Sequence, residues 1–244
     1  MSQAAARAAA LLVAAAAVAW VGLIIVARPM AGMPGTMGLS VGLFVAVWTL
    51  MMAAMMLPSL VPAAARYARA REGRAAAAAA GLAVGYLAVW AAAGLPGYGL
   101  AWLAGWLGGA HPGAARVLAV AFFAGCGLYQ LSGPKRHCLE RCRDAVDLWP
   151  PGGRPVWTAD LRAGARLGGY CLGSSAGLVL ILVAVGLMNV AAMIGLAALI
   201  LVEKAWAGGQ AARRVAGAAA LALALAAIWL PWLAPGLDVA AAGG

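Results

Sequence analysis

The sequence predicts an all-α fold, a polytopic bundle of transmembrane helices without a sizeable soluble domain. Of its 244 residues, 66% are hydrophobic and 10% are charged. In a typical soluble domain about 45–50% of the residues are apolar and about 25% are charged. The apolar residues form long runs, most of them close to the roughly 20 residues that a helix needs to cross a bilayer. We therefore expect a single membrane domain over residues 1–244 whose main partner is the lipid bilayer.

The net charge of +10 does not indicate a nucleic-acid partner. The basic residues lie in short segments between the apolar runs, where Lys and Arg set the orientation of a membrane protein. The first run is longer than the 7–15 residues of a signal-peptide core, so we expect an uncleaved span there. The expected spans, about seven in number, are 8–27, 39–61, 76–98, 115–133, 167–186, 188–202 and 215–233.

The sixth span, 188–202, is short, with about 22 Å of helix against a bilayer core of about 30 Å. The positions of the basic residues nevertheless require it. The segments 134–166 and 203–214 are both rich in Lys and Arg, so both are predicted to be cytoplasmic and to be separated by an even number of crossings. We expect a helix pair that turns near Gly186–Asn189.

The same rule orients the whole bundle with the N-terminus inside and the C-terminus outside. Of the 17 Lys and Arg residues, all but Arg28 and Arg116 fall in segments that this topology assigns to the cytoplasm. The long loop 134–166 is then cytoplasmic. The predicted location is the cytoplasmic (inner) membrane, which the chain crosses several times.

One face of the second span carries four methionines, Met51, Met52, Met55 and Met56. At about 100° per residue they fall within one arc of the helix. Thioether sulfur suits Cu(I) and is a poor ligand for Mg²⁺, Ca²⁺ or Mn²⁺. Methionine also fills irregular gaps in a core. The pattern therefore allows either a copper site or packing.

Three further methionines, Met30, Met33 and Met37, lie in a Gly- and Pro-rich loop that the topology places outside. Such a loop has no helical core for them to fill. Methionine binds Cu(I) without losing a proton, so capture there would depend little on pH. The alternative is an apolar loop that dips into the lipid headgroups.

A cysteine pair, Cys138 and Cys142, follows the fourth span on the cytoplasmic side. Pro134 is well placed to start a short helix, on which these residues, four apart, could share one ion. Neighbouring arginines favour the thiolate form. Two thiolates are enough for a Cu(I) transfer site but too few for a closed zinc site, so zinc is less favoured than copper. A redox thiol pair and two unreactive interfacial cysteines are the alternatives.

Polar and soft side chains also occur within or beside later spans, where they tend to be functional or to hold helices together. Cys171 lies in the fifth span and Met188 at the turn into the sixth. The sixth ends at Glu203-Lys204. Glu203 is either a buried carboxylate or an interfacial residue beside a lysine that extends to the headgroups, and we favour the second interpretation.

Together these motifs resemble a bacterial family, the predicted metal-binding integral membrane proteins (domain of unknown function 2182), some of which are labelled copper chaperones. The similarity covers roughly residues 40–205 and rests on three blocks in the expected order. Many relatives carry a cysteine pair where this chain has Ser174-Ser175, which leaves Cys171 there. The blocks are Trp48 to Ser59, Lys135 to Arg143, and Met188 to Lys204.

The sequence thus favours an integral membrane protein that binds or relays Cu(I) across or at the cytoplasmic membrane, in exchange with a copper-handling protein. We expect a binding or transfer protein rather than an enzyme. The alternatives are a membrane-embedded thiol redox protein that uses Cys138 and Cys142, and a structural subunit of a membrane complex. The deciding observation is whether the methionine face points into the bundle, towards Cys126, Cys171 and Met188, or out to lipid.

Overall fold

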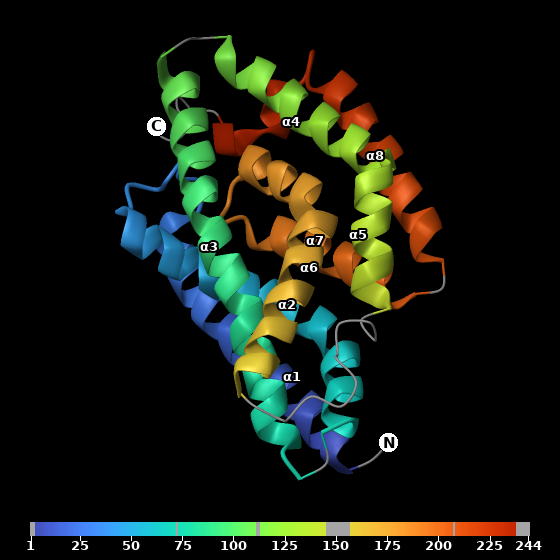
Figure 1. Ribbon diagram of the computed structural model, residues 1–244. Coiled ribbons are helices and arrows are strands. Elements are labelled where there is room, and N and C mark those ends of the chain that lie inside the picture. Colours follow the sequence, from blue (N-terminus) through green and yellow to red (C-terminus); the bar gives the residue numbers. More distant parts are fainter. Residues whose placement is uncertain (1–2, 72, 111–112, 145–156, 207, 238–244) are drawn as a thin grey trace.

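The computed structural model describes residues 3–71, 73–110, 113–144, 157–206 and 208–237. Over these residues the chain forms eight α-helices and short 3-10 turns, without a strand (Figure 1). The all-α prediction is therefore confirmed. The helices are α1 (Gln3–Ala27), α2 (Val41–Arg69), α3 (Ala75–Ala110), α4 (Ala114–Leu131), α5 (Gly133–Arg143), α6 (Trp157–Val185), α7 (Val190–Ala205) and α8 (Gly209–Ala226).

Each predicted span corresponds to one of these helices, with α5 as an additional short one. Among the described residues, α1, α2, α3, α4 and α6 are long and apolar enough to cross a membrane. Helix α7 has only 16 residues, and α8 carries Arg213 and Arg214 within its first two turns. The number of crossings and the N-in, C-out orientation remain predictions.

The predicted loop 134–166 is largely helical where it is described. Helix α5 begins next to Pro134, as predicted, and the Ser132 hydroxyl caps it by accepting from the backbone N–H of Lys135 at 3.4 Å. Helix α6 begins at Trp157 rather than near 167. Residues 145–156 of the loop lie outside the described residues.

The predicted turn between the fifth and sixth spans is confirmed. Helix α6 ends at Val185 and α7 begins at Val190. Gly186 adopts a φ of +108°, which side-chain-bearing residues rarely reach. The Asn189 side chain then caps α7 by accepting from the backbone N–H of Ala192 at 3.0 Å.

The segments that carry the basic residues gather at one end of the bundle. Arg7 of α1 and Arg74, which precedes α3, line one pocket. Arg66, near the end of α2, donates to the carbonyl of Arg143 at the end of α5, 2.9 Å away. Arg28 instead lines a pocket with the α6–α7 turn. These segments, which are predicted to be cytoplasmic, thus lie near one another. Segments on the same side of a membrane must lie at the same end of the bundle.

Helices α3 and α6 come closest to each other at two glycines. A Cβ atom on Gly85 would lie 2.1 Å from the carbonyl oxygen of Leu161, and one on Gly164 would lie 2.0 Å from that of Leu82. Small residues let helices in a membrane approach until their backbones touch. This contact sets the position of α6, and hence of Cys171, against α3.

We expect Gly164→Ala to lower the thermal unfolding temperature of the purified protein in detergent. The added methyl group meets the Leu82 carbonyl oxygen and forces two backbones apart, and overpacking costs about 1–3 kcal/mol. Gly169→Ala is the matched control, because a Cβ atom there meets nothing within 4 Å and alanine is favoured over glycine in a helix by about 0.5–1 kcal/mol. Equal unfolding temperatures for the two variants would contradict the close contact.

Candidate metal site

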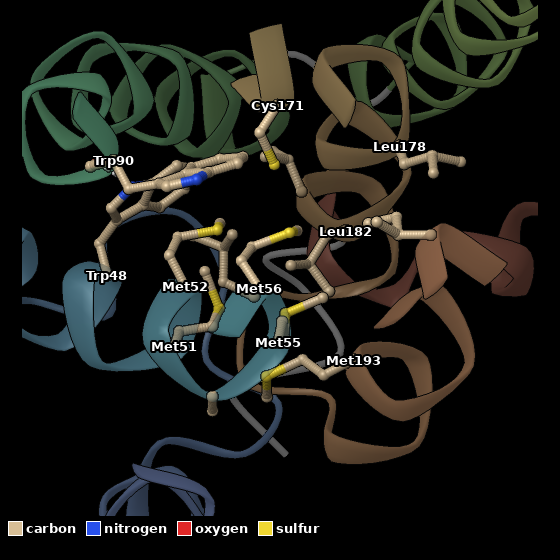
Figure 2. Close-up of a cluster of buried hydrophobic side chains, with 14 of the residues drawn as sticks. Trp48, Met51, Met52, Met55, Met56, Trp90, Cys171, Leu178, Leu182 and Met193 are labelled. Carbon is tan, nitrogen blue, oxygen red and sulfur yellow. Dashed lines mark hydrogen bonds between the residues drawn. The ribbon is translucent and has the colours of Figure 1, made fainter. Parts of the chain in front are cut away.

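The methionine face of α2 points into the bundle. Met52, Met55 and Met56 line one small cavity together with residues of α6 and α7, including Leu182. Figure 2 shows their side chains extending into this interior, with Met193 of α7 beside them. The inward direction is the one that the copper hypothesis requires. At most 4% of each of the four side chains is exposed: Met51, Met52, Met55 and Met56.

A tryptophan anchor sets the rotation of α2. The indole Nε1 of Trp48 donates to the carbonyl of Trp90 on α3 at 2.9 Å. The same ring packs against Gly94 and Gly97, where an added Cβ atom would lie 3.1 Å from it. The methionines follow Trp48 at helical spacing on one side of α2, so this anchor also turns them inward.

Next to the methionine face, the buried thiol of Cys171 on α6 gathers polar partners from three other helices. The hydroxyl of Tyr86 on α3 lies 2.7 Å from its sulfur, with a hydrogen bond between them. The ammonium of Lys204 on α7 donates to the same sulfur at 2.8 Å. The thiol of Cys142 on α5 also forms a hydrogen bond with it. A cation in contact with a thiol favours the thiolate, the form that binds metals.

The Cys142 thiol lies in surroundings that favour its protonated form. Cys142 lies on α5, outside the predicted spans, and its hydrogen bond with Cys171, followed by burial, raises its pKa well above the usual range. Cys142 therefore retains its proton beside the Cys171 sulfur, which also accepts a hydrogen bond from the Lys204 ammonium. A metal ion that binds both sulfurs must displace this proton.

The structure gives different neighbours on α6 to the two cysteines that the sequence predicted to share an ion. Cys142 meets Cys171, whereas Cys138 packs against α6 at Gly173, where an added Cβ atom would lie 2.7 Å from the Cys138 sulfur. Among the described residues, no group of three or more His, Cys, Asp and Glu could hold a metal ion. Cys142 and Cys171 are the thiols in contact, and Lys204 connects Cys171 to Ser59, which follows the methionines on α2.

The favoured interpretation of Glu203 as an interfacial residue is wrong. Its side chain is 2% exposed and accepts from Gln130 Nε2 at 2.8 Å and from Lys135 Nζ at 2.7 Å. Lys204 does not extend to the headgroups but turns towards Cys171. Adjacent residues on a helix point about 100° apart, so a Glu-Lys pair at the end of an apolar helix can serve two different interior sites. The adjacent Glu203 and Lys204 were therefore the signal in the sequence that Lys204 could contact an interior site.

The outer methionines fall into different environments. Met33, which is 47% exposed, and the buried Met188 line one pocket of about 500 Å³ together with Arg28. Met37 is buried in the core, and Met30 packs against that core. The structure thus brings Met33 and Met188 together, while Met30 and Met37 are not among the residues that line this pocket.

Comparison with known proteins connects this geometry to a family. The model of the PpoB2 family, described as copper chaperone, matches residues 45–228. The chain belongs to this family. The match runs from α2 to the end of α8 and includes the methionine face, Cys142, Cys171 and Lys204. A copper-related role therefore has support that is independent of the geometry. No curated protein and no solved structure matches the chain.

Proposed function

We propose that the protein binds Cu(I) inside the membrane, at the sulfur atoms between α2, α5 and α6, and relays it between the two ends of the bundle. The observation that carries this proposal is the buried thiol of Cys171, which contacts Lys204, Tyr86 and Cys142 next to an inward-facing row of methionines. Thiolate and thioether sulfur are ligands that select Cu(I). Membership of a copper chaperone family supports the same ion.

The electrostatics of the site suit a monovalent ion. Two thiolates and one Cu(I) carry a net charge of −1, and the ammonium of Lys204 in contact with Cys171 brings the sum to zero. Burial of net charge is costly, whereas a compensated cluster is tolerated. A closed zinc site usually has four protein ligands, and only two of these soft ligands are thiols. We therefore assign copper rather than zinc.

The proposed path uses weak ligands first and strong ligands last. At the outer end Met33 and Met188 line an open pocket, and Met30 and Met37 assist capture from the same loop. Thioethers are neutral and hold Cu(I) loosely, so the methionines of α2 pass the ion on. The thiolates of Cys171 and Cys142 retain it near the basic end of the bundle, where a copper-handling partner collects or delivers it.

Replacement of Met51, Met52, Met55 and Met56 by leucine is expected to lower the copper content of the purified protein. Leucine keeps the volume and the apolar character, and each such exchange costs less than about 1.5 kcal/mol, so the fold should persist. The measurement is the copper-to-protein ratio after loading with Cu(I) and gel filtration. Leu57→Ile is the control, because Leu57 is a buried residue of the same helix that does not line the inner cavity. A wild-type ratio in the quadruple variant would remove the methionine part of the proposal.

Thiol redox chemistry is a second candidate function, with Cys142 and Cys171 in place of the predicted pair Cys138 and Cys142. Two features favour this function: the hydrogen bond between the two thiols, and the contact of the Lys204 ammonium with Cys171. Rapid alkylation in intact cells, followed by mass spectrometry, measures the oxidised fraction of each cysteine. A cycling Cys142–Cys171 disulfide with negligible bound copper would favour this function over the copper relay.

A further inference from the structure

A pocket at the basic end of the bundle reaches Cys142, one of the two thiols. Its volume is about 160 Å³, and it lies between the ends of α2, α5 and α7. Cys142 and Lys204 line its inner part as members of the proposed site, and Arg66 and Arg143 line it as well. The remaining residues that line it carry no charge: Ser59, Pro62, Ala63, Leu201 and Ala205.

The two arginines of this pocket are held by neutral backbone carbonyls. Arg66 donates to the carbonyl of Arg143 at 2.9 Å, and Arg143 donates to the carbonyl of Trp206 at 2.6 Å. The ammonium of Lys204 contacts Ser59 Oγ at 3.2 Å as well as the Cys171 sulfur. The Nε–H of Arg66 is buried and has no hydrogen-bond partner among the described residues. No carboxylate lines the pocket, so its positive potential is available to an anion.

We propose that this pocket binds a small anionic thiol, which exchanges Cu(I) with Cys142 and Cys171. The inference rests on the proposed copper function and names the ligand class at its basic end. The carboxylates of such a thiol would be bound by Arg66 and Arg143, because guanidinium groups pair with carboxylates through two parallel hydrogen bonds. Its sulfur would then approach Cys142, the thiol that lines the pocket.

The exchange is a ligand substitution that involves no change of oxidation state. The sulfur of the incoming thiol forms a bond to Cu(I) while the bond from copper to the Cys142 sulfur breaks. The proton of the incoming thiol moves to the released Cys142 sulfur, which remains beside Cys171. A second thiol replaces Cys171 in the same way: its sulfur bonds to Cu(I), and its proton moves to the released Cys171 sulfur beside Lys204.

The test compares three small thiols of different charge on the full-length protein loaded with Cu(I). Glutathione is anionic, β-mercaptoethanol is neutral and cysteamine is cationic, and each is added anaerobically at the same thiolate concentration. The rate at which copper leaves the protein is measured by rapid filtration. At low ionic strength glutathione should exceed cysteamine by at least about 10-fold, and the two rates should converge as salt screens the charges.

Variants of the pocket decide whether its arginines cause the faster release of copper by glutathione than by cysteamine. Arg143→Gln and Arg66→Gln should each bring the three rates close together, and Arg66→Lys should retain part of the preference. Arg136→Gln is the matched control, because it removes one positive charge from an exposed residue of α5 that pairs with Glu140 and does not line the pocket. Its rates should equal those of the wild type.

Two kinds of failure are distinguishable. Equal rates for the three thiols in the wild-type protein, or an unchanged order in Arg143→Gln, would overturn the anionic-thiol site while the copper function stands. A protein that takes up no copper at all would overturn the proposed function itself. If Arg66→Gln does not fold, Arg143→Gln and the salt dependence of the wild type still decide the question.

Discussion

Replacement of Cys171 by alanine is expected to abolish tight Cu(I) binding, with a loss of affinity of more than about 100-fold. Exchange of a residue that only supports a metal ligand costs about 10–100-fold, and Cys171 is itself the proposed ligand. Its sulfur is the point where Tyr86, Lys204 and Cys142 meet. The measurement is a competition titration of purified protein against a coloured Cu(I) chelator.

Cys138→Ala provides the matched control for this experiment. Cys138 lies one helical turn from Cys142 on α5 but packs against Gly173, so we expect the affinity of this variant to remain within a few-fold of wild type. The comparison separates the site built by tertiary contacts from the Cys138 and Cys142 pair predicted from spacing. Equal losses in Cys138→Ala and Cys171→Ala would support the predicted pair instead.

Replacement of Lys135 by methionine is expected to destabilise the protein by about 3–5 kcal/mol, the usual cost of breaking a buried ion pair from one side. Lys135 Nζ and Glu203 Oε2 are 2.7 Å apart, and the two side chains are 0% and 2% exposed. Burial lowers the pKa of Lys135, while the Glu203 carboxylate opposes this shift by stabilising the ammonium. Without the ammonium, Gln130 is the remaining side-chain donor in contact with this buried carboxylate.

Unfolding in detergent with increasing denaturant measures this effect, and two further variants test its cause. Lys135→Met combined with Glu203→Gln should regain most of the stability, because removal of both charges leaves neither uncompensated. Glu140→Gln breaks an exposed pair with Arg136, at 3.8 Å, and should cost about 1 kcal/mol or less. If Lys135→Met is no less stable than Glu140→Gln, the pair is not buried as described.

The ion pair also has a consequence for copper binding. It connects α5 to α7, the two helices that supply Cys142 and Lys204 to the proposed site. Loss of the pair should therefore shift Cys142 relative to Cys171 and weaken Cu(I) binding, even though neither partner contacts the metal. The double variant with neutral side chains should recover both properties together.

The sequence by itself determined the fold class, the positions of the helices and the gathering of the basic segments. Hydropathy over about 20 residues and the positions of Lys and Arg are local properties, and each acts on one span at a time. The start of α5 next to Pro134 and the turn at Gly186 were predictable for the same reason, because caps and turns depend on a few neighbouring residues. The spacing of the methionines likewise placed them on one face of α2.

Only the tertiary structure decided where that face points and which thiols meet. A helical period defines a face but not its rotation, which here depends on the hydrogen bond from Trp48 to Trp90. The contact of Cys171 with Tyr86 joins residues 85 positions apart, and that of Lys135 with Glu203 joins residues 68 positions apart. Such contacts depend on how closely whole helices approach each other, as α3 and α6 do at Gly85 and Gly164. The distance between two helices cannot be predicted from a local pattern in the sequence.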